Sequence, residues 1–273
     1  METKQTIFIV ADHGLAIIYF LQSQVVSRLI EAGKRIVLLT QDVLVDQLQE
    51  KFGQPTLIVE GLRYHRCDQY ARSYQFRQQW WLNFLRRVGT SDKINTEAMD
   101  SYIRQVEFET RGKQRSLMVA AKQMVKLLRK SESARKRLIQ KQMRYIPGIY
   151  TDLFEKYNPS LLVSSTYGWR YDRYIMREAI QRGIKTGTVI VGWDNPSSYG
   201  IPCAPLDFVN CWSDIQKNEL VDGSDWEPSS VNVGGIPSYD NYFNGSWLIP
   251  REEYFTKHRL DPERKLISYA CSF

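Results

Sequence analysis

The first 60 residues alternate short apolar runs with helical patterns, and this alternation restricts the fold more than any other feature of the chain. Strand patterns lie at 7–11, 35–40 and 56–60, and the first is apolar at every position, as suits a strand buried on both faces. Helical spacing predicts one helix over 15–32 and a second that Asp42 caps. This β-α-β-α-β order predicts an α/β fold built on a doubly wound parallel sheet.

A long segment then lacks any strand pattern. From about 66 to 157 the sequence predicts two or three long helices, with turns near 88–95 and 131–133. Helical patterns then separate four further predicted strands, at 160–164, 185–191, 207–211 and 230–233. We therefore expect a helical insertion between two halves of one sheet.

The last residues predict a change of domain. Residues 238–264 are rich in aromatic side chains and hold one short helical pattern, and 265–270 has the pattern of one more strand. We expect a Rossmann-like domain over 1–237, with its insertion at about 66–157, and a linker over 238–264. Residues 265–273 are then expected to begin a second α/β domain that is truncated here.

Charge is unevenly distributed along the chain. The formal net charge is +7, but residues 62–144 hold 20 Lys/Arg against 7 Asp/Glu. Residues 111–144 carry 12 basic side chains and a single acid, with apolar residues at helical spacing. Basic helices beside the tryptophans at 80–81 are typical of proteins on an anionic membrane surface, which we take as the expected partner. A solvated basic face and a nucleic-acid site are the alternatives, the latter the less favoured.

Several classes of protein are not supported by the sequence. No apolar run approaches the roughly 20 residues that span a bilayer, and the chain starts without the apolar segment of a signal peptide. Its cysteines form no CxxC pair, which is typical of reduced thiols in a cytoplasmic protein and gives no reason to expect a metal. They are Cys67, Cys203, Cys211 and Cys271.

Polar loops follow three of the predicted strands. The carboxyl ends of parallel strands meet at one edge of a sheet, where ligands of open α/β folds bind. We therefore expect one crevice from all three loops. The expected site residues are Asp12, His13 and Gly14 after the first strand, Tyr167 and Arg170 after the strand at 160–164, and Trp193, Asp194 and Asn195 after the strand at 185–191.

The residue types suggest roles for some of these side chains. His13 lies where a helix N-terminus favours a neutral imidazole, as a general base requires, and Asp12 could orient it. Arg170 could pair with an anion. The alternative is that the same residues only cap helices or form turns. The turn at Asp12 lacks both the GxGxxG and the GxxxxGK[ST] pattern, so no dinucleotide or P-loop phosphate site is expected there.

Two glycines follow the last strand of the predicted first domain. Gly234 and Gly235 would let the backbone approach a ligand or a neighbouring domain closely. A tight turn that leads into the linker is the alternative interpretation.

Four stretches together resemble the N-terminal half of GT-B glycosyltransferases. They read N-P-S-L-L-V-S-S-T at 158–166, R-G-I-K-T at 182–186, G-W-D-N-P-S-S at 192–198 and V-G-G-I-P at 233–237. The sequence is most similar to the group described as CDP-glycerol glycerophosphotransferase-like proteins. The resemblance covers roughly 158–273, with looser agreement at 6–40, and the Trp-Asp-Asn loop is its most specific part.

The resemblance implies a two-domain enzyme with its active site between two Rossmann-like halves. The N-terminal half of such enzymes binds the acceptor, here a glycan or a lipid-linked molecule of the cell envelope, and a base from the first loop, His13 or Asp12, deprotonates it. A nucleotide-sugar or CDP-activated donor binds the other half as substrate, without a further cofactor. A cytoplasmic protein, peripheral at the membrane, is implied. A non-catalytic basic module and an epimerase acting on nucleotide sugars remain the alternatives.

Overall fold

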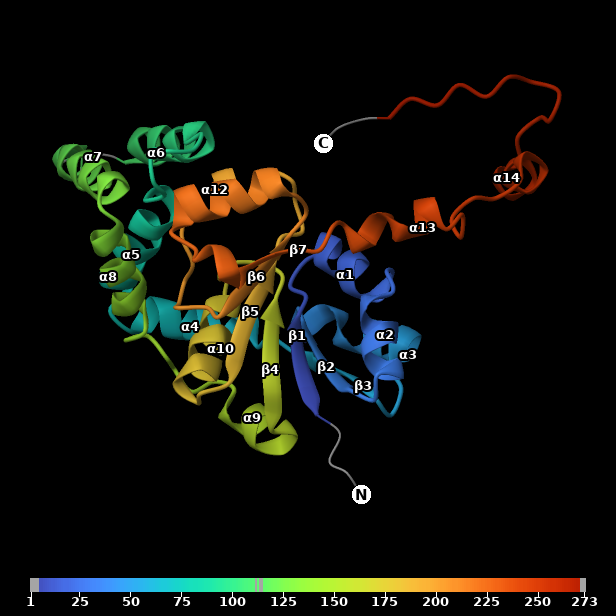
Figure 1. The fold of residues 1–273 in the computed structure, drawn as a ribbon, viewed down its shortest axis with the longest axis horizontal. Coiled ribbons are helices and arrows are strands. Elements are labelled where there is room, and N and C mark those ends of the chain that lie inside the picture. Colours follow the sequence, from blue (N-terminus) through green and yellow to red (C-terminus); the bar gives the residue numbers. More distant parts are fainter. Residues whose placement is uncertain (1–4, 111, 113–114, 271–273) are drawn as a thin grey trace.

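A computed structural model describes residues 5–110, 112 and 115–270 of the chain, and its centre is one sheet of seven strands. All strand pairs are parallel and the order is β3-β2-β1-β4-β5-β6-β7 (Figure 1). The doubly wound parallel sheet predicted from the sequence is confirmed. The strands are β1 Thr6–Val10, β2 Arg35–Thr40, β3 Leu57–Gly61, β4 Pro159–Ser164, β5 Lys185–Val189, β6 Phe208–Cys211 and β7 Val231–Val233.

The strand order reverses between β1 and β4. Strand β1 pairs with β2 on one side and with β4 on the other, so the chain winds outward in both directions from this point. A crevice opens outside the carboxyl ends of strands at such a switch point, because the connections on either side diverge there. The loops after β1 and β4 are therefore the first place to look for a site.

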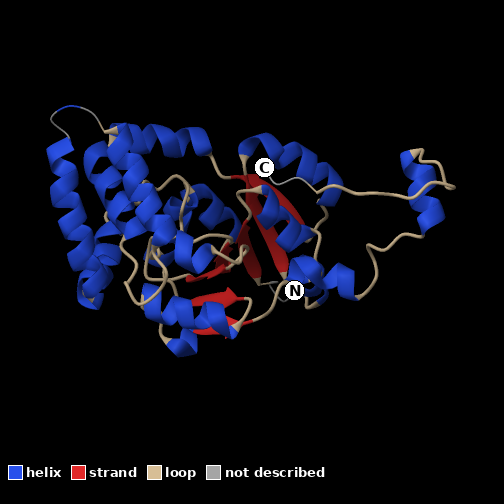
Figure 2. Ribbon diagram, turned by 90° about the horizontal axis from the view of Figure 1, so that it is seen from above, coloured by secondary structure: helices blue, strands red, loops and turns tan. Residues whose placement is uncertain are grey.

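Helices cover both faces of the sheet (Figure 2). Alternate residues of β1 explain why this strand is apolar from Ile7 to Val10. Phe8 packs with the helices at Thr151–Tyr157 and Asp172–Gln181 on one face, whereas Ile9 packs with those at Gly14–Leu21 and Val25–Glu31 on the other. The α-helices are α1 Gly14–Leu21, α2 Val25–Glu31, α3 Val45–Phe52, α4 Tyr64–Ser73, α5 Phe76–Val88, α6 Glu97–Glu109, α7 Arg115–Lys130, α8 Glu132–Gln142, α9 Thr151–Tyr157, α10 Asp172–Gln181, α11 Asn195–Ser198, α12 Asp214–Ser224, α13 Asp240–Phe243 and α14 Arg251–His258.

Helices α4 to α9 lie between β3 and β4, where the sequence predicts an insertion. They are shorter and more numerous than predicted, although both predicted turns, near 88–95 and 131–133, are present. Helices α5 to α8 share a small core of their own, which includes Phe84, Ile103 and Val125. The insertion is therefore a packed helical layer beside the sheet.

The helix predicted over 15–32 is wrong as a single element, because it divides into α1 and α2 at Ser23. The Ser23 hydroxyl donates to the carbonyl of Tyr19 and accepts from the amide of Val25, so its side chain competes with the helical backbone bonds. Asp42 was expected to cap its own helix. Its carboxylate accepts instead from the backbone amides of Arg63 (2.9 Å) and Tyr64 (2.8 Å), at the start of α4.

The strand predicted at 265–270, as the start of a second domain, stays a prediction. These residues are extended and exposed, and they pair with no strand among the residues that the structure describes. An extended segment becomes a strand only when a neighbour accepts its backbone hydrogen bonds. The segment that holds α14 stands away from the sheet and its helices in both views (Figures 1 and 2).

Candidate functional site

The loop after β1 is held rigidly at the switch point. Asp12 has no exposed surface, although it lies two residues beyond the end of β1, at the carboxyl edge of the sheet. Its backbone carbonyl accepts from Gln41 Nε2 at 2.7 Å, and the Thr40 hydroxyl donates to the carbonyl of Ala11 at 2.9 Å. Both donors come from the end of β2, so the neighbouring strand fixes the position of Asp12.

Asp12 and His13 interact directly. His13 Nδ1 lies 2.6 Å from Asp12 Oδ1, and the His13 side chain is 18% exposed. The backbone of His13 is extended and directly precedes α1. Consecutive side chains on an extended backbone usually point apart, so this contact requires the imidazole to turn back over Asp12. The turned ring thus keeps its Nδ1 edge on a buried carboxylate.

Three further side chains surround the carboxylate of Asp12. The Ser165 hydroxyl donates to Oδ1 at 3.2 Å, the Tyr64 hydroxyl donates to Oδ2 at 3.3 Å, and Arg170 Nε lies 3.9 Å from Oδ2. Burial by itself raises the pKa of Asp12, but the hydrogen bond and charge of His13, with Arg170 and Ser165, outweigh it and lower the pKa below its usual value. Asp12 is therefore an anion at neutral pH.

A second carboxyl group lies behind the same loops. Asp172 is fully buried and accepts from the hydroxyls of Ser164 (3.0 Å) and Thr166 (2.5 Å) and from the amide of Arg170 (3.0 Å). Burial, and then the negative charge of Asp12, raise the pKa of Asp172. The two carboxyl groups thus differ in role: Asp172 shapes the loop after β4, and Asp12 faces the histidine.

This arrangement leaves one imidazole nitrogen available for chemistry. An ionised carboxylate can only accept hydrogen bonds, so Nδ1 of His13 carries the hydrogen that Asp12 accepts. In the neutral imidazole, Nε2 then has its lone pair free. A histidine oriented in this way by a buried aspartate can take a proton from a hydroxyl group, and the resulting imidazolium is stabilised by the aspartate.

The structure brings three of the expected residues together, Asp12, His13 and Arg170. Gly14 is the first residue of α1, and a Cβ built on it would meet no atom within 4 Å, so this position is open to a ligand. The guanidinium of Arg170 is about half exposed, with 53% of its side-chain surface accessible. It can therefore meet an anion in the crevice while it remains beside Asp12.

The Trp-Asp-Asn loop lies after β5, next to β4 in the sheet. The side chain of Asn195 is buried and serves its own loop, because its Oδ1 accepts from the amide of Gly192 at 2.8 Å. Trp193 is 76% exposed. Burial first, and then the charges of Asp194 and Asp12, raise the pKa of Tyr199 to about 12. The charges of Asp194 and Asp12 thus both raise the pKa of the Tyr199 hydroxyl. Asn195 instead holds its own loop through the bond to Gly192.

Two expected residues lie elsewhere. Tyr167 has no exposed surface and packs against Tyr199 and Trp226 in an apolar cluster, so its side chain belongs to the core. Gly235 follows β7, three strands away from β4, with a left-handed φ of 76°. From there the chain runs to the end of α1, where Asn241 Nδ2 donates to the carbonyl of Gln22 at 2.8 Å.

Three residues around Asp12 and Asp172 are not among the site residues expected from the sequence. Tyr64 begins α4 just after β3, Ser165 follows β4, and Asp172 opens α10. Tyr64 and Ser165 also follow strands of the sheet, so their positions after apolar runs could have indicated them. Asp172 lies at a helix start, where an aspartate is ordinarily only a cap.

The loop after β4 depends on Gly168. Its φ is +82°, and an added Cβ would lie 2.1 Å from Cys203 Sγ. We expect Gly168→Ala to reduce the free energy of unfolding by about 2–3 kcal/mol, through the left-handed backbone and the overlap together. Gly183→Ala is the matched control, because Gly183 has a φ of +73° with no atom within 4 Å of an added Cβ. Urea unfolding of both variants checks this, and equal losses would contradict the overlap with Cys203.

Comparison with known proteins assigns no family to this arrangement. No family model matches the chain, and no curated protein matches it. Among the residues described, no helix has the length and apolar character needed to cross a bilayer. In the same part of the chain, no group of three His, Cys, Asp or Glu side chains is close enough together to hold a metal ion.

Proposed function

We propose that this chain is the acceptor-binding half of a GT-B-type transferase. Such an enzyme moves a sugar or related group from a nucleotide-activated donor to a hydroxyl of a cell-envelope or lipid-linked acceptor. The observation that supports this best is the pair of Asp12 and His13, joined at 2.6 Å at the switch point of the sheet. In this proposal the donor binds a second α/β domain that faces the same edge.

Each residue then has a definite part in the transfer. His13 Nε2 takes the proton as the acceptor oxygen forms its bond to the transferred carbon or phosphorus. The bond from that atom to the nucleotide's phosphate oxygen breaks, and the nucleotide leaves with the electron pair. Asp12 stabilises the imidazolium, and Arg170 holds an anionic group beside it.

Acceptor-dependent release of nucleotide tests the class of reaction. The full natural polypeptide would be incubated with radiolabelled UDP-hexoses or CDP-glycerol, with and without an extract of lipid-linked glycans. We expect free nucleotide and labelled glycan to appear together, and only when the extract is present. Conversion of a UDP-hexose into its epimer without release of UDP would instead favour the epimerase alternative.

A second proposal concerns helices α7 and α8, which we propose lie on an anionic membrane. Four of their basic residues form ion pairs, which reduces the positive charge that these helices present to a membrane. The pairs are Lys122–Glu107, Arg129–Asp100, Arg135–Asp225 and Lys136–Glu132. Among the side chains that the structure describes, the remaining exposed cations of these helices are Lys126, Lys130, Arg137 and Lys141, and Arg144 follows α8.

An apolar hollow supports the second proposal. It has a volume of about 590 Å³ between α5, α7 and α8, is lined chiefly by leucines and by Met124, and has Arg137 and Lys141 among its lining residues. Leu127 is 70% exposed on its wall. Exposed apolar side chains next to exposed cations match the interface of an anionic bilayer, where the apolar groups insert and the cations meet the headgroups.

Replacing Leu127 tests this surface. We expect Leu127→Asp to weaken binding to vesicles containing phosphatidylserine about tenfold, because it removes an inserted side chain and adds a repelled charge. Val43→Asp is the control, since Val43 is 84% exposed beside α3, away from the basic helices. Sedimentation with vesicles measures both. If the two variants weakened binding equally, the proposal that α7 lies on the membrane would be wrong.

A further inference from the structure

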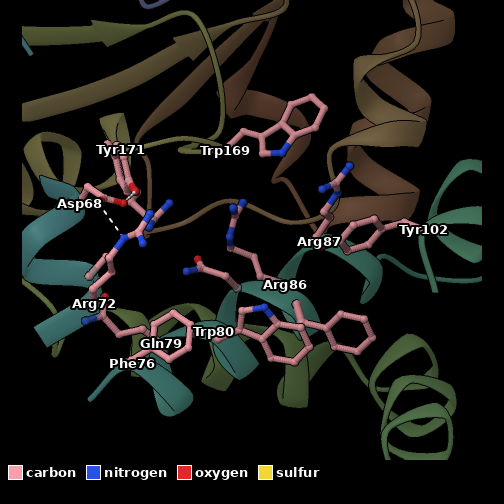
Figure 3. A pocket seen from close by; sticks show the side chains of 14 residues that line it. Asp68, Arg72, Phe76, Gln79, Trp80, Arg86, Arg87, Tyr102, Trp169 and Tyr171 are labelled. Carbon is pink, nitrogen blue, oxygen red and sulfur yellow. Dashed lines mark hydrogen bonds and ion pairs between the residues drawn. The ribbon is translucent and has the colours of Figure 1, made fainter. Parts of the chain in front are cut away.

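A cavity of about 560 Å³ lies beside the switch-point crevice and has no role in the proton transfer described above. Its walls come from α4, α5 and α6 of the insertion and from the loop after β4 (Figure 3). In Figure 3, Trp169 and Tyr171 lie on one side and Phe76, Gln79 and Trp80 on the other, with Arg86 between them. Its volume is in the range of small-molecule sites, roughly 300–1,000 Å³.

The cavity carries an excess of positive charge. Four arginines line it, Arg72, Arg86, Arg87 and Arg173, against a single carboxylate, Asp68. That carboxylate is already engaged, since Arg72 Nε lies 2.7 Å from it and the Tyr171 hydroxyl donates to it at 2.5 Å. Among the described residues, no carboxylate forms an ion pair with any of the other three arginines.

Arg86 is a buried cation without a counter-charge among the described residues. It is 2% exposed, and its two terminal nitrogens donate only to the carbonyls of Ile201 and Gly168, each at 3.0 Å. Its Nε has no partner, and burial lowers its pKa to about 10. A buried cation without a counter-charge is costly, so a bound anion nearby would stabilise it.

The other polar groups of the cavity are similarly incomplete. Arg87 is held by rings alone, with its guanidinium carbon 3.6 Å from the centre of the Tyr102 ring and 4.8 Å from that of Trp169. Nε of Arg173 and Oδ1 of Asn83 are buried without partners. The set thus combines cations for an oxyanion with an unfilled hydrogen-bond acceptor, which a hydroxyl group would satisfy.

One loop connects the wall of the cavity with the surroundings of Asp12. Trp169 and Tyr171 line the cavity, whereas Arg170 between them reaches Asp12. The ring of Tyr171 also packs edge-on against Tyr64, 5.5 Å between centres, and Tyr64 donates to Asp12. A molecule held between the rings therefore borders the residues around His13.

We propose that this cavity binds an anionic sugar, with its phosphate or carboxylate toward Arg86 and the arginines on either side of it, Arg72, Arg87 and Arg173, and its ring against the exposed aromatic faces. The rings offer apolar surface, and the arginines offer paired donors for an oxyanion. This deepens the proposed function, on which it rests, because it gives the acceptor an anionic group. Binding needs no transfer, so its failure and that of the base role of His13 are separable.

Tryptophan fluorescence measures this binding directly, because Trp80 and Trp169 line the cavity. The probes are glucose 6-phosphate, glucuronate, glucose and inorganic phosphate. We expect saturable quenching by at least one of the two anionic sugars, and at least tenfold weaker binding of glucose. The anionic sugar that binds more tightly shows whether the site prefers a phosphate or a carboxylate. Equal affinity for inorganic phosphate would overturn the assignment of the rings to a sugar, and no saturation by either anionic sugar would overturn the proposal.

Matched arginine variants locate the site. Arg87→Met and Arg72→Met should each weaken binding about tenfold, because each loses a charge-assisted contact. Arg77→Met is the control, since Arg77 is exposed on α5 but does not line the cavity. Arg72 is exposed, so its variant tests the site even if Arg87→Met unfolds. Wild-type affinity in a folded Arg72→Met protein, or equal weakening by Arg77→Met, would overturn the proposal.

Discussion

Replacing His13 by alanine should lower the rate of acceptor-dependent transfer by about 10²–10⁴, the usual contribution of a positioned general base. The reason is geometric: Nδ1 is held 2.6 Å from Asp12, which leaves Nε2 to take the acceptor proton. Asp12→Asn should cause a loss of similar order, because an amide can donate to Nδ1 and reverse which nitrogen carries the hydrogen. Initial rates with saturating donor measure both variants.

A second histidine provides the control for this experiment. His258 is exposed at the end of α14, away from the sheet, and His258→Ala should leave the rate unchanged. Circular dichroism of each variant shows whether the fold is kept. If a folded His13→Ala protein transferred at the wild-type rate, the base would have to be another group, and the proposed role of the Asp12–His13 pair would be wrong.

The sequence predicts the sheet well because its strands are buried on both faces. A run such as Ile7–Val10 is apolar at every position, since Phe8 and Ile9 enter different cores on opposite faces. Four consecutive apolar residues of this kind predict a strand without knowledge of their neighbours. The expectation that polar loops follow these strands at one edge then depends only on the strands being parallel.

The finer geometry of the site depends on partners distant in sequence. His13 was an evident candidate, but its contact with Asp12 is accompanied by hydroxyls from Tyr64 and Ser165, which are 52 and 153 residues away from Asp12. Partners distant in sequence also explain why the prediction for Asp42 was wrong. A cap looks local in sequence, yet its carboxylate accepts from amides at the start of α4, because β2 and β3 bring those segments together.

The composition of the basic segment does not predict which of its basic side chains are exposed. Net charge counts every arginine, whereas burial decides which ones face solvent. Arg86 lies inside the cavity wall, and Arg135 lies between the insertion and α12, so both contribute to the basic count of 62–144 without adding to its surface. The sequence cannot separate these from exposed residues such as Arg137, because all lie on similar basic helices.

The ion pair of Arg135 and Asp225 should be the strongest polar link between the insertion and the sheet domain. Arg135 donates through Nε and a terminal nitrogen to the two oxygens of Asp225, each at 2.6 Å, and the side chains are 5% and 9% exposed. Arg135 also donates to the carbonyls of Leu128 and Arg129 at the end of α7. Arg135→Met should therefore reduce the free energy of unfolding by about 3–5 kcal/mol, because it leaves a buried carboxylate unpaired.

The double variant separates the pair from simple loss of packing. Asp225 has a left-handed φ of 58°, which asparagine tolerates, so Asp225→Asn removes the charge without backbone strain. Adding it to Arg135→Met should recover part of the lost stability, since no uncompensated charge then remains buried. The exposed pair of Lys136 and Glu132 on the same helix is the control, and Lys136→Met should barely change the urea midpoint. If the double variant is no more stable than Arg135→Met, the unpaired charge is not the cause, and packing of the arginine stem holds α8 in place.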